Sequence, residues 1–373
     1  MLISAALIVK NEQERLGRCL SSIRDVVDEI VIVDTGSTDD TVAIAESFGA
    51  VVLHRPWDGN FSAARNCALD AVRAPTVLYI DADEYLEFGT RAAIETALNG
   101  PGDHVAWRLS FTQRPGFTPY MEYRVWRNRP DLRFHGVIHE SVVPAIDTVC
   151  LTEGKTVGIL DWRLQHDGYE GDQSVKHARN LPLLQAQLVD SPDRTYLWDH
   201  IGRIHDDRGE TDEARSAYNK GLEIIRRKGL QDPSDSLIYA DLILSNAVTH
   251  RPDAPLVAEA VGLLPRNTVI RWSCALDALS RRAWDEVITH IDAVLDVPVE
   301  EMSYQGLGMN AKITSEWAYH VRGMARFQLG EYAAAAQDFA TAEASSPGAI
   351  AYRAKRILAQ ARSRRWSSPS SAN

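Results

Sequence analysis

Two aspartates separated by one residue follow an apolar run. The run is Val77 to Ile80, and Asp81 and Asp83 come after it. In an extended segment, side chains at positions i and i+2 point the same way, so the two carboxylates are expected to face one side. Carboxylate oxygens are hard ligands, and open α/β sheets bind ligands beyond the carboxyl ends of their strands. The pair therefore suits a divalent cation that neutralises a pyrophosphate. The alternative is an acidic turn that only closes the strand.

Three more polar residues are expected at the same edge of the sheet. Asp34 ends the apolar run 30–33, and Arg65 and Asn66 lie early in a predicted helix. Asp34 can accept hydrogen bonds from a base or a ribose, and an arginine can hold a phosphate through two parallel hydrogen bonds. Together with the carboxylate pair, these residues supply what a nucleotide needs. The alternatives are an Asx turn at Asp34 and a helix-surface ion pair at Arg65.

Strands that alternate with helices are expected to position these residues. Apolar runs predict buried strands at residues 3–9, 30–33, 51–53 and 76–80, and helical spacing predicts helices at residues 16–23, 38–48 and 61–72. This alternation predicts βαβ units and a mostly parallel sheet. Aromatic and β-branched runs then predict a mixed or antiparallel extension that shapes a second binding face. These runs are HVAWRLSF, YRVWRN, RFHGVIHESVV and TVGILDWRLQH.

Beyond about residue 175 the pattern is helical and repeats itself. One segment has Gly202, Ala214, Tyr218 and Gly221, and a second has Gly323, Ala335, Phe339, Ala342 and Pro347 at the matching offsets. Small residues at these intervals are typical of the tetratricopeptide repeat, in which they lie where two helices cross. The stretch around residues 272–294 is similar to a degenerate repeat, and a generic helical bundle is the alternative.

These patterns predict two domains and a tail. The 373-residue chain is longer than one ordinary domain. Residues 1–172 are expected to form an α/β domain, with a nucleotide half at 1–100 and an acceptor half at 101–172. An all-α domain is predicted at residues 173–361, and the polar tail at 362–373 is predicted to be disordered.

Composition excludes several classes of partner. The net charge of −11 disfavours nonspecific binding to nucleic acid or to an anionic membrane surface. Apolar runs fall short of the roughly 18 residues that span a bilayer, so no membrane insertion is expected. The N-terminal apolar run lacks a preceding basic region and is predicted to be a core strand. The four cysteines are scattered, as in a reducing compartment, which predicts a cytoplasmic protein.

The ordered motifs also carry a family resemblance. IVKNE (8–12), DEIVIVDTGSTDDT (28–41), FSAARN (61–66) and DADEYL (81–86) resemble the successive motifs of family 2 glycosyltransferases with the GT-A fold. The resemblance covers residues 3 to about 86 and continues more weakly through RFHGVIHES and LQHDGY. It is strongest to a branch with tetratricopeptide repeats after the catalytic domain, which includes peptide S-glycosyltransferases. It implies a Rossmann-like GT-A domain, mostly parallel with an antiparallel extension, followed by a tetratricopeptide-like helical domain.

The resemblance implies a role for each matching residue. Ile8 and Val9 would line the nucleobase pocket with Asp34, and Arg65 would bind near the base or the diphosphate. Asp81 would contact the ribose or the donor sugar, with Asn66 and Ala82 beside it in the nucleotide-sugar site. Asp83 would ligate Mn²⁺ or Mg²⁺ through its Asp-X-Asp motif. Many GT-A enzymes add a later histidine to the metal, and His166 in LQHDGY is the candidate; the alternative is a histidine that only ends a strand.

Most family members invert the anomeric centre, which requires one general base for the acceptor proton. Glu140 is the first candidate, and His139 is the alternative, as a base or as a group that orients the acceptor. A solvated glutamate on an edge strand is the other interpretation of Glu140. Zinc proteases place HExxH on one helix, whereas here Gly136 and β-branched neighbours favour a strand or a loop. A zinc site is therefore not expected.

The sequence predicts a metal-dependent, inverting glycosyltransferase that uses a nucleotide-sugar donor, with a UDP-sugar as the first candidate. The acceptors left open are a peptide cysteine, serine or threonine, a saccharide and a small metabolite. The repeats are expected to recruit a peptide or to mediate a homodimer. One alternative is an interaction module whose GT-A domain senses sugar nucleotides or is inactive. Another is a nucleotidyltransferase, which would usually show a glycine-rich loop where this chain has IVKNE.

Overall fold

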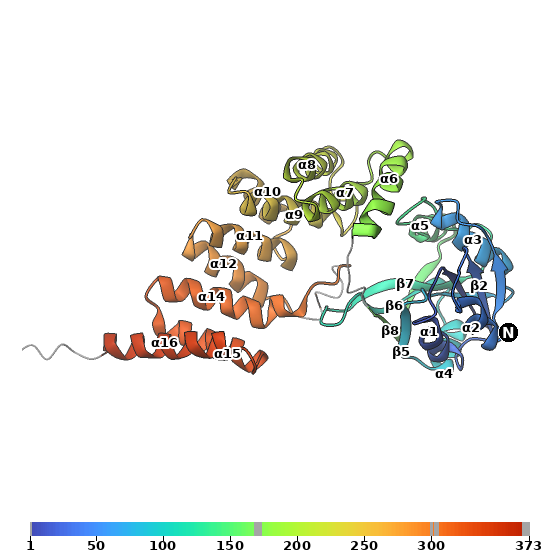
Figure 1. Cartoon of the computed structure of the whole chain (residues 1–373), viewed down its shortest axis with the longest axis horizontal. Coiled ribbons are helices and arrows are strands. Elements are labelled where there is room, and N and C mark those ends of the chain that lie inside the picture. The colour runs from blue at the N-terminus through green and yellow to red at the C-terminus, as the bar shows by residue number, and fades with distance from the viewer. Residues whose placement is uncertain (1, 168–173, 299–300, 302–305, 368–373) are drawn as a thin grey trace, which may run out of the picture. The chain divides into compact units, whose positions relative to one another are not determined.

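The chain folds into two compact units. A computed structural model describes residues 2–167, 174–298, 301 and 306–367. The units are Met1–Pro192 and Asp193–Asn373 (Figure 1). The predicted domain boundary at 172 and 173 lies outside the described residues. Helix α6 (Ser174–Asp190), which the sequence pattern assigned to the helical domain, groups with the first unit.

A mixed sheet organises the first unit. The strand order is β3-β2-β1-β4-β7-β6-β8-β5. The β1, β2, β3 and β4 pairings are parallel, as is the pairing of β6 with β8, whereas β7 runs antiparallel to β4 and β6, and β5 antiparallel to β8. The strands are β1 (Ser4–Val9), β2 (Glu29–Asp34), β3 (Val51–His54), β4 (Thr76–Tyr79), β5 (Glu84–Phe88), β6 (His104–Thr112), β7 (Tyr120–Arg127) and β8 (Thr156–His166). The predicted mostly parallel sheet with an antiparallel extension is confirmed.

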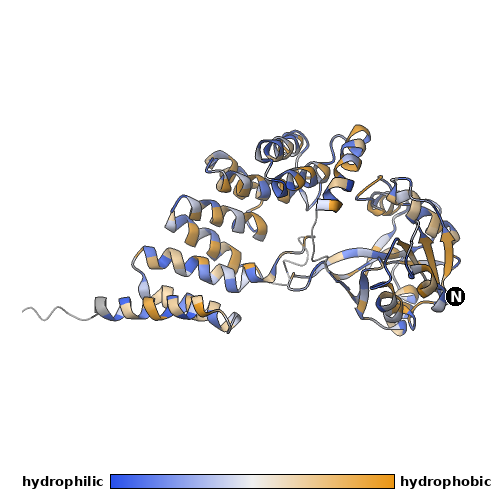
Figure 2. Cartoon of the chain, in the orientation of Figure 1, coloured by the Kyte–Doolittle hydropathy of each residue, from blue (hydrophilic) through white to orange (hydrophobic). Residues whose placement is uncertain are grey.

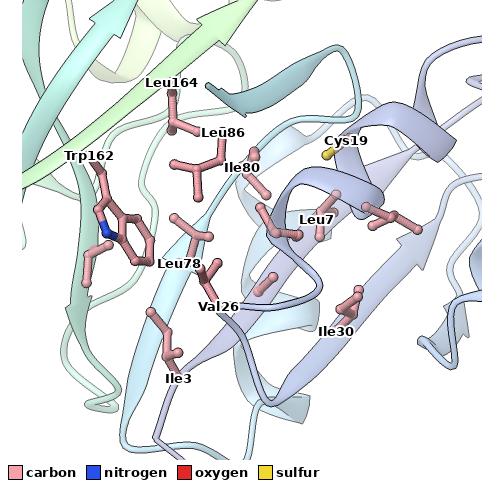
Figure 3. Packing of buried hydrophobic residues seen from close by; sticks show 14 of the residues in the cluster. Ile3, Leu7, Cys19, Val26, Ile30, Leu78, Ile80, Leu86, Trp162 and Leu164 are labelled. Carbon is pink, nitrogen blue, oxygen red and sulfur yellow. The ribbon is translucent and has the colours of Figure 1, made fainter. Parts of the chain in front are cut away.

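Helices cover both faces of this sheet and give it two apolar cores. Side chains of α1 pack on one face with Leu7, Leu78 and Trp162 (Figure 3). On the other face, Ala68 and Leu69 of α3 pack with Val31 and Val33. The helices of this unit besides α6 are α1 (Leu16–Ile23), α2 (Thr41–Ser47), α3 (Phe61–Ala71), α4 (Arg91–Asn99) and α5 (Val143–Glu153). Figure 2 shows hydrophobic colour on several strands of the sheet, and β1 and β2 are buried along almost their whole length, as expected for strands covered on both faces.

One run of the predicted extension, for which a strand or a loop was expected, is a loop. RFHGVIHESVV is a loop whose ends meet in a single bridge between His135 and Ser141, after which α5 begins. Gly136 has φ +101° and His139 has φ +49°, and such backbone cannot continue a strand. The sequence reading also omitted β5, α4 and α5, which are short and have weak periodicity.

The second unit consists of helices that pack in consecutive pairs. They are α7 (Thr195–Asp207), α8 (Thr211–Lys228), α9 (Asp235–Val248), α10 (Ala254–Leu263), α11 (Thr268–Ser280), α12 (Trp284–Leu295), α14 (Glu316–Gln328), α15 (Tyr332–Ser345) and α16 (Ile350–Ser367), with a 3₁₀ turn at Ala311–Thr314. A Cβ on Gly202 would lie 2.3 Å from the Tyr218 ring, and one on Gly323 would lie 2.8 Å from the Phe339 ring. Glycine therefore permits the same close helix crossing in both predicted repeats.

The last helix extends further than predicted. Helix α16 continues through Ser367, so the prediction of disorder was wrong for residues 362–367, and residues 368–373 lie outside the described part. Among the helices that the structure describes, none combines the length and apolar character needed to cross a bilayer.

Candidate active site

The turn after β4 carries both aspartates of the Asp-X-Asp motif. The Glu84 N–H donates to the Asp81 carbonyl at 3.0 Å, so the chain turns at residues 82 and 83. The expectation that both carboxylates face one way from an extended segment was therefore wrong, because each finds a different partner. Ala82 is 4% exposed and packs into the core, so its side chain does not enter the site.

Arg65 joins two of the predicted site residues. It lies in the first turns of α3, and its Nη1 and Nη2 donate to the Asp81 carboxylate at 2.8 and 3.4 Å. Its Nε donates to Glu140, and its guanidinium stacks over the Tyr79 ring at 4.4 Å. Because the Arg65 side chain is only 9% exposed, the alternative of a helix-surface ion pair is wrong.

Opposite charges in this cluster stabilise one another in their ionised forms. Burial alone would lower the pKa of Arg65, but Asp81, Tyr79 and Glu140 raise it well above the ordinary value. Burial raises the pKa of Asp81, but the charge and hydrogen bonds of Arg65 outweigh it, and the pKa lies below the ordinary value. Tyr79 Oη also donates to Asp81 Oδ2 at 3.0 Å. Arg65 and Asp81 are therefore both ionised near neutral pH.

Asp83 faces His166, the candidate second metal ligand. His166 Nε2 lies 3.0 Å from Asp83 Oδ2, and His166 Nδ1 lies 2.9 Å from the Gln113 carbonyl. A carbonyl only accepts, so Nδ1 carries a hydrogen and Nε2 is directed at the carboxylate. Burial lowers the pKa of His166, but the hydrogen bond and charge of Asp83 raise it more, so the net direction is upward.

This pair has the donor set of a metal site. Histidines that ligate metals usually donate their other ring N–H to a carbonyl or a carboxylate, as His166 does to Gln113. Mg²⁺ in nucleotide enzymes is held by one or two carboxylates together with substrate phosphates. Within the described residues, no group of three His, Cys, Asp or Glu side chains could hold an ion alone. Asp83 and His166 fit Mn²⁺ or Mg²⁺ when diphosphate oxygens complete the coordination.

Asp34, which was predicted to line the nucleobase pocket, caps a turn of its own backbone. Asp34 accepts hydrogen bonds from the Gly36 and Ser37 amides at 3.2 and 3.0 Å, so the Asx turn is present. Burial alone would raise the pKa of Asp34, but hydrogen bonds from Ser37, Gly36 and His54 have the larger, opposite effect. The pKa of Asp34 therefore lies below its ordinary value. His54 Nδ1 approaches the same carboxylate at 3.4 Å.

Ile8 and Val9 point to opposite faces of β1. Val9 is 3% exposed and packs in the core with α1, so its side chain cannot line a base pocket. Ile8 lines a pocket together with Arg65, Tyr79 and Phe134. The volume of this pocket is about 10 Å³, which holds roughly one water molecule. A base would have to displace these side chains or lie outside this pocket.

Helix α3 also holds the loop that carries Glu140 and His139. The Asn66 amide donates to the Phe134 carbonyl at 3.0 Å and accepts from the Phe134 N–H at 2.8 Å. Ser62 Oγ donates to the Gly136 carbonyl at 2.6 Å. Asn66 therefore secures the loop through both ends of its side-chain amide, and this is the contact that the structure gives it.

Sequence reasoning missed three charged residues around the motif. Glu84 binds the Asp81 amide, and Arg124 of β7 is buried against Glu84. Glu12 is the third: burial and the charge of Asp83 raise its pKa, which places another carboxylate near the motif. A signal existed for Arg124, since it stands between Tyr123 and Val125, and charged residues are rarely buried without a partner.

Comparison with known proteins agrees with this geometry. Residues 4–135 match the model of glycosyl transferase family 2, which contains the turn, Arg65 and the first residue of the 135–141 loop. The chain carries a family 2 glycosyltransferase domain. A tetratricopeptide repeat model matches residues 195–227, which are α7 and α8. The predicted repeat is therefore confirmed for this helix pair.

Three relatives match parts of this chain. A TPR repeat-containing protein of Synechococcus elongatus is 34% identical over 233 residues, which cover 59% of this chain and 56% of the relative. The SPbeta prophage-derived glycosyltransferase SunS of Bacillus subtilis is 28% identical over 217 residues, 54% of this chain and 48% of SunS. An uncharacterized glycosyltransferase of Rickettsia felis is 44% identical over 93 residues, 25% of this chain and 32% of the relative. The chain thus spans about half the length, or less, of these relatives.

Proposed function

We propose that this chain is a metal-dependent, inverting glycosyltransferase that moves a sugar from a UDP-sugar to an acceptor. The observation that carries the proposal is the Asp83–His166 pair, in which Nδ1 is engaged by Gln113 and Nε2 is directed at the carboxylate. The pair lies beside the ionised Arg65–Asp81 cluster in a domain that matches family 2. In this proposal, the Asp83–His166 pair is the cation site and the Arg65–Asp81 cluster is part of the donor site.

Each residue has a task in this proposal. Asp83 and His166 hold the ion, and a Mn²⁺ or Mg²⁺ ion bound there would neutralise charge on the leaving diphosphate. Asp81 meets the ribose or the donor sugar, and Tyr79 and Arg65 fix its carboxylate for this contact. Arg65 would bind a donor phosphate at this edge, provided that donor binding loosens one of its carboxylate contacts.

The general base is proposed on the loop at residues 134–141. Glu140 accepts a hydrogen bond from Arg65 and its side chain is 9% exposed, so in this state it orients Arg65. Proton transfer to Glu140 would require that contact to open, and His139 lies next to it on the same loop. Both residues are therefore candidates for the general base. The proposed acceptor is a peptide side chain that the repeats help to recruit. A thiol acceptor would need the base least, because cysteine is partly ionised near neutral pH.

Nucleotide release from a panel of UDP-, GDP- and dTDP-sugars tests the proposal without a known acceptor. Slow hydrolysis of one donor is expected with Mn²⁺ or Mg²⁺ and not with EDTA. Asp83→Ala should abolish it, while Asp161→Ala, which removes an exposed aspartate from β8, should leave it unchanged. Release that ignores EDTA and Asp83→Ala would refute the metal-dependent mechanism. An absence of both release and donor-dependent thermal stabilisation would instead favour an interaction module.

A further inference from the structure

A buried ion pair lies directly behind the motif turn. Arg124 of β7 and Glu84 at the start of β5 have side chains that are 4% and 3% exposed. The guanidinium holds the carboxylate with two bonds, Nη1 to Oε2 at 2.9 Å and Nη2 to Oε1 at 2.8 Å. Stability alone gives no reason for such a pair, because well-packed apolar residues at buried positions are often as stable or more stable.

The pair is connected to Asp81 through the backbone. Glu84 Oε2 accepts the Asp81 N–H at 2.9 Å, and the Glu84 N–H donates to the Asp81 carbonyl at 3.0 Å. These reciprocal bonds close the turn at residues 81–84. Since the Arg124 fork fixes the orientation of the Glu84 carboxylate, it also fixes the acceptor on which the turn depends.

A second connection runs through an aromatic ring. The Arg124 guanidinium stacks over the Tyr79 ring at 4.6 Å, and Tyr79 Oη donates to Asp81 Oδ2 at 3.0 Å. Arg124 therefore supports both the backbone and the side chain of Asp81, although its own side chain does not reach the carboxylate.

We propose that Arg124 and Glu84 are positioning residues that preset the motif turn for the metal. This inference rests on the proposed function. His166 is held by the Gln113 carbonyl at one side of the site. Asp83 is held by the turn and by the Asp167 N–H, which donates to the Asp83 carbonyl at 3.0 Å. The separation of the two metal-binding atoms therefore depends on the shape of the turn as well as on this backbone contact at the end of β8. Metal sites lose affinity when the groups that orient their ligands are removed.

The first test compares two glutamine variants that touch the same arginine. Glu84→Gln weakens the fork and the contact with the Asp81 amide. Glu122→Gln is the matched control, because Glu122 also binds Arg124, at 2.8 and 3.0 Å, but lies on β7 and not in the turn. The Mn²⁺ concentration for half-maximal donor hydrolysis should rise about tenfold or more in Glu84→Gln. It should stay at the wild-type value in Glu122→Gln.

Two further measurements separate positioning from a loss of folding. Glu84→Gln leaves the buried Arg124 with the partly exposed Glu122 as its remaining carboxylate partner, which is expected to lower stability. The double variant Glu84→Gln with Arg124→Met removes both charges and should fold, yet keep the raised Mn²⁺ requirement. Hydrogen exchange of a peptide covering residues 76–88 should accelerate in both variants and not in Glu122→Gln.

The outcomes distinguish this inference from the proposed function. If the wild type hydrolyses a donor with metal and the folded double variant has the wild-type Mn²⁺ requirement, the positioning role is refuted and the proposed function stands. A lower kcat with an unchanged Mn²⁺ requirement and unchanged exchange would also refute it. A wild type without metal-dependent turnover would overturn the proposed function and this inference with it.

Discussion

Replacing Arg65 with methionine should destabilise the first unit strongly. Arg65 donates two hydrogen bonds to Asp81 and one to Glu140, and its side chain is 9% exposed. Hydrogen bonds to charged groups contribute about 1.5–3 kcal/mol each, which sets an upper bound for the sum. Water can reach Asp81, which is 29% exposed, so the loss should fall short of that bound. We expect about 3–5 kcal/mol, as when one partner of a buried pair is removed.

A rescue variant shows whether unpaired charge is the cause. Glu140→Gln in the Arg65→Met background removes one of the two uncompensated carboxylates and should recover part of the loss. Arg24→Met is the control, because Arg24 is 65% exposed and its contact with Asp25 is a surface ion pair worth about 0–1 kcal/mol. The urea midpoint should be followed by hydrogen exchange of peptides from residues 61–88, so that unfolding of the helical unit does not enter the value.

A small loss would refute this reasoning. If Arg65→Met unfolds at the same urea concentration as Arg24→Met, Arg65 is not the charge that balances the two carboxylates. If Glu140→Gln restores nothing, the destabilisation comes from lost packing against the Tyr79 and Phe134 rings.

Three further predictions concern the supports of the site and the repeats. Gly202→Ala should lower the free energy of unfolding, measured by thermal unfolding, by about 1–3 kcal/mol, because its Cβ would lie 2.3 Å from an aromatic ring. Gly262→Ala is the control: its Cβ would meet open space, so it should raise the free energy of unfolding by about 0.5–1 kcal/mol. Asn66→Ala removes two hydrogen bonds to the loop at 134–141, so that loop should exchange amide hydrogens faster and stability should fall by about 1–3 kcal/mol. Asp34→Asn should destabilise near neutral pH and less as pH falls below about 4, because the native pKa of Asp34 is lowered and its contribution is lost as the native carboxylate protonates.

Periodicity predicted the elements whose burial is simple. β1 and α1 were recognised because one is apolar throughout and the other has Leu16, Cys19, Leu20 and Ile23 on a single face. The same reasoning left the segment at 134–141 open between a strand and a loop. Its path is set instead by side-chain bonds from α3, which no local pattern reveals.

The residues of the site were likewise predictable only in part. Sequence order placed Asp34, Arg65, Asp81 and Asp83 at one edge, because each follows a strand of the sheet or begins the next helix. Facing directions required the structure: Val9 turned out to be in the core, and Glu140 to contact Arg65. Arg124 is distant in sequence from Glu84, so their pairing depends on β7 lying beside β4.

Binding of Mn²⁺ in the presence of UDP tests the central claim most directly. The full chain would be titrated while the electron paramagnetic resonance signal of the free ion is followed. Asp83 and His166 supply two ligands and the diphosphate completes the site, so the wild type should bind Mn²⁺ tightly with UDP and weakly without it. Asp83→Ala should lose this UDP-dependent binding, and Asp161→Ala should retain it. Equal Mn²⁺ binding by the wild type and Asp83→Ala would contradict the claim that this pair holds the metal.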